Sequence, residues 1–82
     1  MGTKPRPKPE RLAMKLLAIR QRLGFSQWEM CRLLNLQVNS SRISEYETGI
    51  REPNLMVLLA YARAGDVPVE RIIDDQLDLY NS

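Results

Sequence analysis

Apolar residues recur at the three- and four-residue intervals of an α-helix along most of the chain, and no two-residue alternation predicts a β-strand. The clearest stripe holds four residues spaced i, i+4, i+7 and i+11: Leu12, Leu16, Ile19 and Leu23. Pro9 suits the first turn of a helix, and Gly24 is a typical C-cap residue. The pattern therefore predicts a first helix over residues 9–23.

The strongest local signal marks the start of a second helix. Ser26 is followed three positions later by Glu29, the spacing of a capping box, in which each residue satisfies the other's backbone N–H. Phe25 and Met30 flank this box as a hydrophobic staple. We expect the helix to end at Asn35, which can adopt a left-handed cap conformation. Three apolar residues form its expected buried face: Met30, Leu33 and Leu34.

A third helix is predicted over residues 39–48, between Asn39, a good N-cap residue, and Gly49, which stops a helix. Three of its residues share one face and are expected to contact the core: Ile43, Tyr46 and Glu47. The remaining polar residues project elsewhere, mostly towards solvent: Ser40, Ser41, Arg42 and Glu45. The pattern alone leaves open whether this polar face meets a partner or is merely solvated.

Two shorter helices complete the pattern. Pro53 opens the fourth helix and Gly65 caps it, while Pro68 and Glu70 begin the fifth. The expected apolar positions of the fourth are Leu55, Leu58, Leu59 and Ala62, and those of the fifth are Val69, Ile72 and Ile73. Five short helices predict a compact all-α bundle, and the second and third, joined by a brief turn, have the sequence shape of a helix-turn-helix.

We place the helical domain at residues 9–74. The segments before and after it differ from each other in charge. Residues 1–8 alternate Pro with Lys or Arg, which predicts a flexible basic arm, and residues 75–82 form an acidic tail. Residues 1–51 carry a net charge of +6 and residues 52–82 carry −4. This asymmetry is consistent with a polyanionic partner on one face and equally with an ordinary solvated surface.

Composition excludes several kinds of chemistry. The chain has no His and a single Cys, Cys31, so a zinc site and a Cys–His or Ser–His nucleophile are essentially excluded, and we expect no enzyme, metal or cofactor. No small-molecule substrate is evident. The longest apolar run, Leu55–Ala62, is eight residues, far below the length of a membrane span. The lone cysteine and the absence of an apolar leader predict a cytoplasmic protein.

Three segments of the sequence together resemble the Cro/C1-type helix-turn-helix family, also called XRE-like: IRQRLGFSQWEMCRLL, SRISEYETG and EPNLMVLLAYARAGDVPVERII. The resemblance covers roughly residues 12–73. It implies a lambda-repressor-like five-helix bundle that binds double-stranded DNA sequence-specifically as a transcriptional regulator, a repressor. It also implies that helix 39–48 lies in the major groove, and a homodimer on a two-fold operator is expected.

The resemblance implies roles for particular residues. Four match or adjoin base-contacting positions: Ser40, Ser41, Arg42 and Glu45. Four are expected at DNA phosphates: Gln27, Asn39, Thr48 and Arg51. Arg20 and Glu47 match a pair that forms a structural salt bridge between the first and third helices, and Cys31 is expected to be a small core residue. Trp28 has two interpretations, an exposed aromatic beside the DNA backbone or, slightly preferred, packing across the first helix.

The turn between the second and third helices departs from the family pattern. Ile43 follows Asn35 by eight residues where the family has about six, so two extra residues lie between the helices. The turn lengthens, with Leu36 and Val38 entering the core, or the third helix gains about half a turn at its N-terminus.

Two other functions stay open. One is an antitoxin-like autorepressor whose acidic tail binds a partner protein. The other is a protein-interaction module that kept the fold without binding DNA. Within the tail, Leu77, Leu79 and Tyr80 are candidates for a dimer contact.

Overall fold

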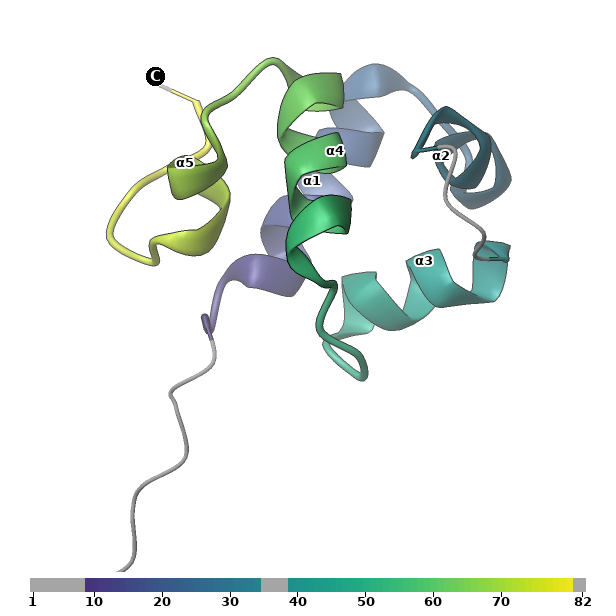
Figure 1. Ribbon diagram of the computed structural model, residues 1–82, viewed down its shortest axis with the longest axis horizontal. Coiled ribbons are helices and arrows are strands. Elements are labelled where there is room, and N and C mark those ends of the chain that lie inside the picture. Colours follow the sequence, from purple (N-terminus) through teal and green to yellow (C-terminus); the bar gives the residue numbers. More distant parts are fainter. Residues whose placement is uncertain (1–8, 35–38, 81–82) are drawn as a thin grey trace, which may run out of the picture.

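The computed structural model describes residues 9–34 and 39–80, and five helices make up its architecture (Figure 1). They are α1 (Leu12–Leu23), α2 (Gln27–Leu34), α3 (Ser40–Thr48), α4 (Leu55–Gly65) and α5 (Val69–Ile73). The described residues contain no strand, so the all-α prediction is confirmed. The predicted arm at residues 1–8 and the turn residues 35–38, including Leu36 and Val38, lie outside the described residues.

The helices surround a single core. Figure 1 shows α1 and α4 in the middle of the molecule, with α2 and α3 on one side and α5 on the other; α1 contacts α3, α4 and α5. The largest fully buried side chains come from all five helices: Leu16, Ile19, Met30, Ile43, Tyr61 and Ile72. A bundle this small buries a modest share of its surface, so each of these contacts matters for its stability.

Local capping sets the start of α2 and both ends of α3 as the sequence predicts. The Glu29 N–H donates to Ser26 Oγ over 3.0 Å, and the Ser26 N–H donates to Glu29 Oε1 over 2.9 Å. At α3, Asn39 Oδ1 accepts from the Arg42 N–H over 3.1 Å, and Gly49 adopts the left-handed conformation with φ 80°. Because each cap lies within a few residues of its helix, sequence spacing is enough to find it.

The predicted limits of α1 and α4 were wrong by a few residues. α1 begins at Leu12 instead of Pro9, because the cap comes from far along the chain: the Asp75 carboxylate accepts from the Glu10 and Arg11 N–H groups over 2.8 and 3.0 Å. α4 begins after Asn54, whose Oδ1 accepts from the Val57 N–H over 2.9 Å. Its left-handed cap residue is Asp66, one position past Gly65.

Three residues expected in the core are exposed. Leu33, Leu55 and Ile73 expose 46%, 77% and 36% of their surface, whereas Val57 and Tyr61, which the stripe for α4 omitted, are buried. Leu55 opens a run of eight consecutive apolar residues, so spacing alone cannot select the buried face.

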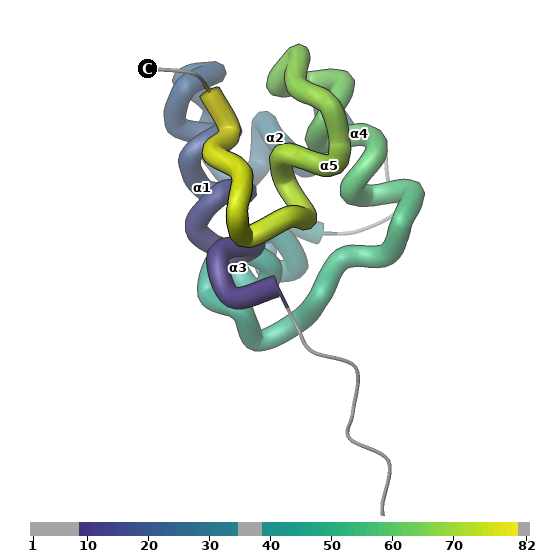
Figure 2. Tube along the Cα trace, turned by 90° about the vertical axis from the view of Figure 1, so that its left-hand side faces the viewer, coloured from purple at the N-terminus to yellow at the C-terminus, as the bar shows by residue number. Residues whose placement is uncertain are grey.

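The acidic C-terminal segment, residues 74–80, lies along α1 from its first turn to its last (Figure 2). Beside the Asp75 cap, Lys15 Nζ donates to three carbonyl oxygens, of Arg71, Asp74 and Leu77, over 2.7–2.8 Å. At the other end, the Arg22 guanidinium lies 3.9 Å from the centre of the Tyr80 ring. Leu79 is buried in this chain's own core, so it is not available as the dimer contact suggested from the sequence.

Candidate nucleic-acid interface

Helix α3 is fixed to the bundle by two buried apolar residues and one ion pair. Ile43 and Tyr46 expose 0% and 4% of their surface. Arg20 of α1 binds the Glu47 carboxylate through both Nε and Nη2, over 2.6 and 3.0 Å, which is the salt bridge expected from the sequence. A pair with this little exposure is tolerated only because both groups are hydrogen-bonded, and here Arg20 Nη1 also donates to the Phe25 carbonyl oxygen.

Gln27, at the start of α2, joins the same network. Its Nε2 donates to Glu47 Oε1 over 3.1 Å, so one carboxylate connects α1, α2 and α3. The amide of Gln27 carries two N–H groups, and one of them is used in this network inside the protein. Gln27 therefore lies both at the start of α2 and in the network around Glu47. Its hydrogen bond links α2 to α3.

The outward side of α3 carries a cluster of one carboxylate and two guanidinium groups. Arg42 Nε and Arg51 Nε each lie 3.2 Å from Glu45 Oε1. The three side chains are between 35% and 49% exposed, so they are reachable from solvent. We call this set the Glu45 cluster. This cluster was not predicted from the sequence. The i,i+3 spacing of Arg42 and Glu45 indicates that these two can pair, but Arg51 reaches Glu45 only because of the turn after Gly49.

Two hydroxyl groups of α3, those of Ser41 and Thr48, are engaged with the helix backbone or its cap. Ser41 Oγ donates to Asn39 Oδ1, the oxygen that also caps the helix. Thr48 Oγ1 donates to the Ser44 carbonyl oxygen over 3.0 Å. Ser40 is half-buried at the first helical position. Of the residues predicted from the sequence, the structure thus groups Ser41, Arg42, Glu45, Thr48 and Arg51 on the outer side of α3, while Gln27 lies at the junction with α2.

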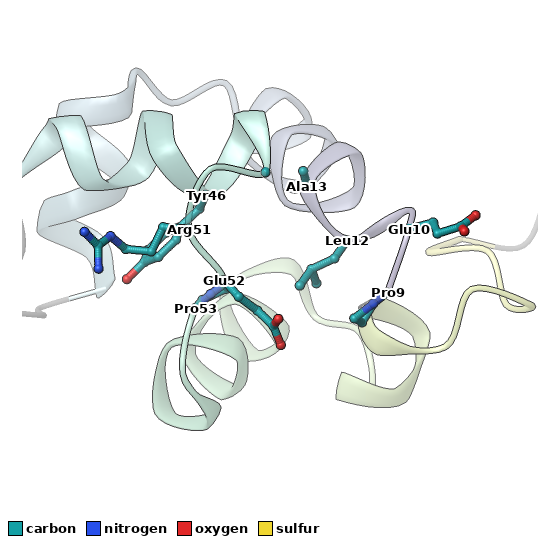
Figure 3. Close-up of a pocket in the computed structure, with 9 residues that line it drawn as sticks. Pro9, Glu10, Leu12, Ala13, Tyr46, Arg51, Glu52 and Pro53 are labelled. Carbon is teal, nitrogen blue, oxygen red and sulfur yellow. The ribbon is translucent and has the colours of Figure 1, made fainter. Parts of the chain in front are cut away.

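Arg51 lies beside an apolar pocket of about 320 Å³, whose lining includes Leu12, Tyr46 and Pro53. Figure 3 shows the Arg51 guanidinium extending away from Leu12 and Pro9. Its hydrogen bond to Glu45 lies on that side. Arg51 therefore lines the pocket, while its charge lies at the surface of α3 beside Glu45.

Trp28 is exposed, so the interpretation in which it packs across α1 is wrong. It exposes 58% of its surface, and the Arg32 guanidinium lies 5.0 Å from its ring centre. The i,i+4 spacing of an aromatic and a cation on α2 was a signal for this contact. Cys31 is half-buried against the core, in a position compatible with the small core role expected of it.

A metal-binding cluster and a membrane-spanning helix are both absent from residues 9–34 and 39–80. That part of the chain holds no group of three or more His, Cys, Asp or Glu that could bind a metal ion. Each of its helices is too short or too polar to cross a membrane.

This arrangement of α2 and α3 agrees with comparisons to known proteins. The family model HTH_3 (Helix-turn-helix) matches residues 16–72, and the chain belongs to this family, which confirms the resemblance noted in the sequence. Curated proteins give no match. Three solved chains match, and one of them is the crystal structure of the P22 c2 repressor protein in complex with synthetic operator 9T in the presence of Tl+.

The similarity to the P22 c2 repressor protein extends over most of both chains. It covers 78% of this chain and 94% of that one, with a TM-score of 0.69 and 23% sequence identity. The two proteins therefore share the lambda-repressor-like fold predicted from the sequence. At that identity the likeness concerns the fold alone.

Proposed function

We propose that this protein binds double-stranded DNA sequence-specifically as a transcriptional regulator, a repressor, with α3 in the major groove. The observation that carries the proposal is the division of α3 into two faces. Ile43, Tyr46 and Glu47 hold one face to the bundle, and the other presents Arg42 and Glu45 to solvent. A rigidly held helix with polar, reachable side chains is what reading base edges requires. The P22 c2 repressor protein, similar in fold, is described in complex with an operator.

Bases would be contacted from the first half of α3 and its outward stripe, by Ser40, Ser41, Arg42 and Glu45. An arginine can bind the O6 and N7 of guanine with two hydrogen bonds, whereas a carboxylate accepts from the N4 amine of cytosine. The serine hydroxyls discriminate less, because they donate or accept with equal ease. Arg42 and Glu45 are therefore expected to contribute most of the sequence preference.

Phosphates would be contacted around this helix by Gln27, Asn39, Thr48 and Arg51. Arg51 supplies charge, and Gln27 supplies its second amide N–H at the start of α2, where the helix dipole favours an anion. The geometry ranks Thr48 lower. Its hydroxyl hydrogen already bonds the Ser44 carbonyl oxygen, and donating it to a phosphate would break that bond.

A single domain of this size makes few phosphate contacts, and we expect it to bind as a homodimer on a two-fold operator. The two recognition helices would then lie about 34 Å apart, one turn of the duplex. A dimer also doubles the number of cations that release counterions from the DNA.

A protein-interaction module is the second candidate, and exposed apolar side chains near α3 and at the start of α4 favour it. Ile50, Leu55 and Met56 expose 75%, 77% and 65% of their surface. Such side chains are typical of contacts with another protein. The same side chains are compatible with a dimer on DNA, so the DNA test has to come first.

The experiment is selection of bound sequences from a random duplex pool at moderate salt, followed by the same selection with Arg42→Ala. The wild type is expected to enrich one motif, and Arg42→Ala is expected to lose it while the far-ultraviolet circular dichroism stays unchanged. A pool that enriches no motif contradicts DNA recognition and leaves the protein-interaction module. Enrichment of the same motif by Arg42→Ala would remove Arg42 from the base-reading set.

A further inference from the structure

We propose that Glu45 is a specificity-determining residue. Its carboxylate holds Arg42 and Arg51 away from DNA phosphates until the correct base takes the place of these arginines as the partner of the carboxylate. This inference rests on the proposed function and adds a way in which the Glu45 cluster separates an operator from other DNA. It concerns residues that can reach the duplex, and it needs no ligand or partner beyond DNA.

The outward surface of α3 carries less positive charge than its arginines alone would give it. Within α3 the two carboxylates have separate partners: Glu47 is 5% exposed and binds Arg20, while Glu45 faces outward. The outward carboxylate shares one oxygen between two guanidinium groups, at 3.2 Å from each. Two cations that would otherwise attract any phosphate are therefore reduced to a net charge of +1 at the surface where the duplex is expected.

A phosphate that binds these arginines must compete with Glu45. The Nε atoms of Arg42 and Arg51 each lie 3.2 Å from Glu45 Oε1, and Arg51 Nε donates a hydrogen bond to it, so a phosphate that approaches either Nε competes with that carboxylate oxygen. Once the arginines leave, a bare carboxylate faces a polyanion. A carboxylate has no proton to donate, so it cannot bind phosphate and repels it. On DNA of arbitrary sequence this repulsion opposes binding.

A particular base pair can relieve that repulsion. In the major groove, the cytosine N4 amine offers a donor to a carboxylate, and guanine on the opposite strand offers two acceptors to an arginine. A G·C pair under α3 can therefore satisfy Glu45 and one arginine together, and the other arginine is released to the phosphate backbone. Specificity follows because both exchanges are favourable only where that base pair is present.

The test compares Glu45→Gln with Glu70→Gln, each of which removes one negative charge. Glu70 is exposed on α5, on the side of α1 and α4 away from α3 (Figure 1), so Glu70→Gln controls for net charge. Binding of the enriched duplex and of a scrambled duplex is measured by fluorescence anisotropy over a series of salt concentrations. Folding of each variant is checked by its melting curve.

We expect Glu45→Gln to bind the scrambled duplex about ten-fold more tightly than wild type and to lose about ten-fold in the ratio of enriched to scrambled affinity. The affinity of this variant for the scrambled duplex should fall more steeply with salt than that of wild type. The difference should correspond to about one to two additional phosphate contacts, each of which adds roughly 0.9 to the slope of log K against log salt. Glu70→Gln should stay within about two-fold of wild type, because exposed charges beyond a Debye length of about 8 Å are screened.

A second arm separates this restraint from plain repulsion between Glu45 and DNA. Glu45→Gln is made in wild type and in the Arg51→Gln background, and the gain in affinity for the scrambled duplex is compared. The gain in the Arg51→Gln background should be smaller by a factor of about three, which is the coupling expected for an exposed ion pair. An equal gain in both backgrounds overturns the proposal, as does a Glu45→Gln variant that matches Glu70→Gln. If wild type enriches no motif, DNA recognition itself fails, and this inference fails with it.

Discussion

Replacing Lys15 by Met should unfold the contact between α1 and the C-terminal segment. Lys15 exposes only 3% of its surface, and its ammonium group donates to the carbonyl oxygens of Arg71, Asp74 and Leu77 over 2.7–2.8 Å. All three hydrogens of the group are thus used. Met keeps the apolar stem at similar length and supplies no donor, so the three carbonyls, one in α5 and two in the segment after it, lose their common partner.

The size of the effect follows from these three bonds. A hydrogen bond from a charged group contributes about 1.5–3 kcal/mol, which would give roughly 4–9 kcal/mol for three. The ammonium loses several kcal/mol of solvation when buried, and water can reach the carbonyls once the segment loosens. The net loss we expect is about 3 kcal/mol, a large share of the stability of a domain of this size. At about 4–8 °C per kcal/mol, the melting temperature should fall by roughly 12–24 °C.

The assay is thermal unfolding followed by circular dichroism, with urea unfolding as a second measure of the free energy. Arg63→Met is the matched control: it also replaces a long cation with Met, but on the exposed side of α4. The control should stay within about 0.5 kcal/mol of wild type. A loss for Lys15→Met below about 1 kcal/mol, or equal to the loss for Arg63→Met, would refute the reasoning that these bonds hold the segment.

Three further outcomes are expected. The N–H groups of Arg11 and Glu10 hold the pKa of Asp75 below its ordinary value of 3.8, so its contribution to stability is present above that pH and disappears as the pH falls through the lower folded pKa. Asp75→Asn should therefore melt below wild type at pH 7, with a gap that narrows in acid; a constant gap contradicts the cap. Burial raises the pKa of Tyr61, and its hydroxyl has no hydrogen-bond partner among the described residues. Tyr61→Phe should raise the free energy of unfolding in urea by about 1 kcal/mol, and a loss would show an overlooked partner. Glu47→Gln should lower that free energy by about 2 kcal/mol by leaving Arg20 without a counter-charge, and an unchanged value would mean that the pair contributes nothing.

The start of a helix could be predicted from the sequence where the residue that caps it lies close by in the chain. The capping box at Ser26 and the cap at Asn39 act within three residues, and the starts of α2 and α3 were predicted correctly. The start of α1 was not, because its cap is Asp75, 64 positions from Arg11. The buried face of α4 was assigned partly wrongly, because a run of apolar residues has no polar side to mark its orientation.

The same limit applies to the candidate interface. The pairing of Arg20 with Glu47 was expected from the resemblance, and the structure contains it. The Glu45 cluster was not expected, because the position of Arg51 depends on the left-handed turn at Gly49 and on how the chain continues into α4. How the two extra residues between α2 and α3 are accommodated depends on residues 35–38, which lie outside the described residues, so the assignment of bases to Ser40 and Ser41 stays a prediction.

Contact between the outward side of α3 and DNA is the expectation on which the proposed function depends. It is tested most directly by following backbone amide signals in nuclear magnetic resonance while the enriched duplex is added. The largest changes are expected at Ser41, Arg42 and Glu45 and at Gln27 at the start of α2, with little change along α5. Changes centred on α4 or α5, with α3 unaffected, would contradict the claim.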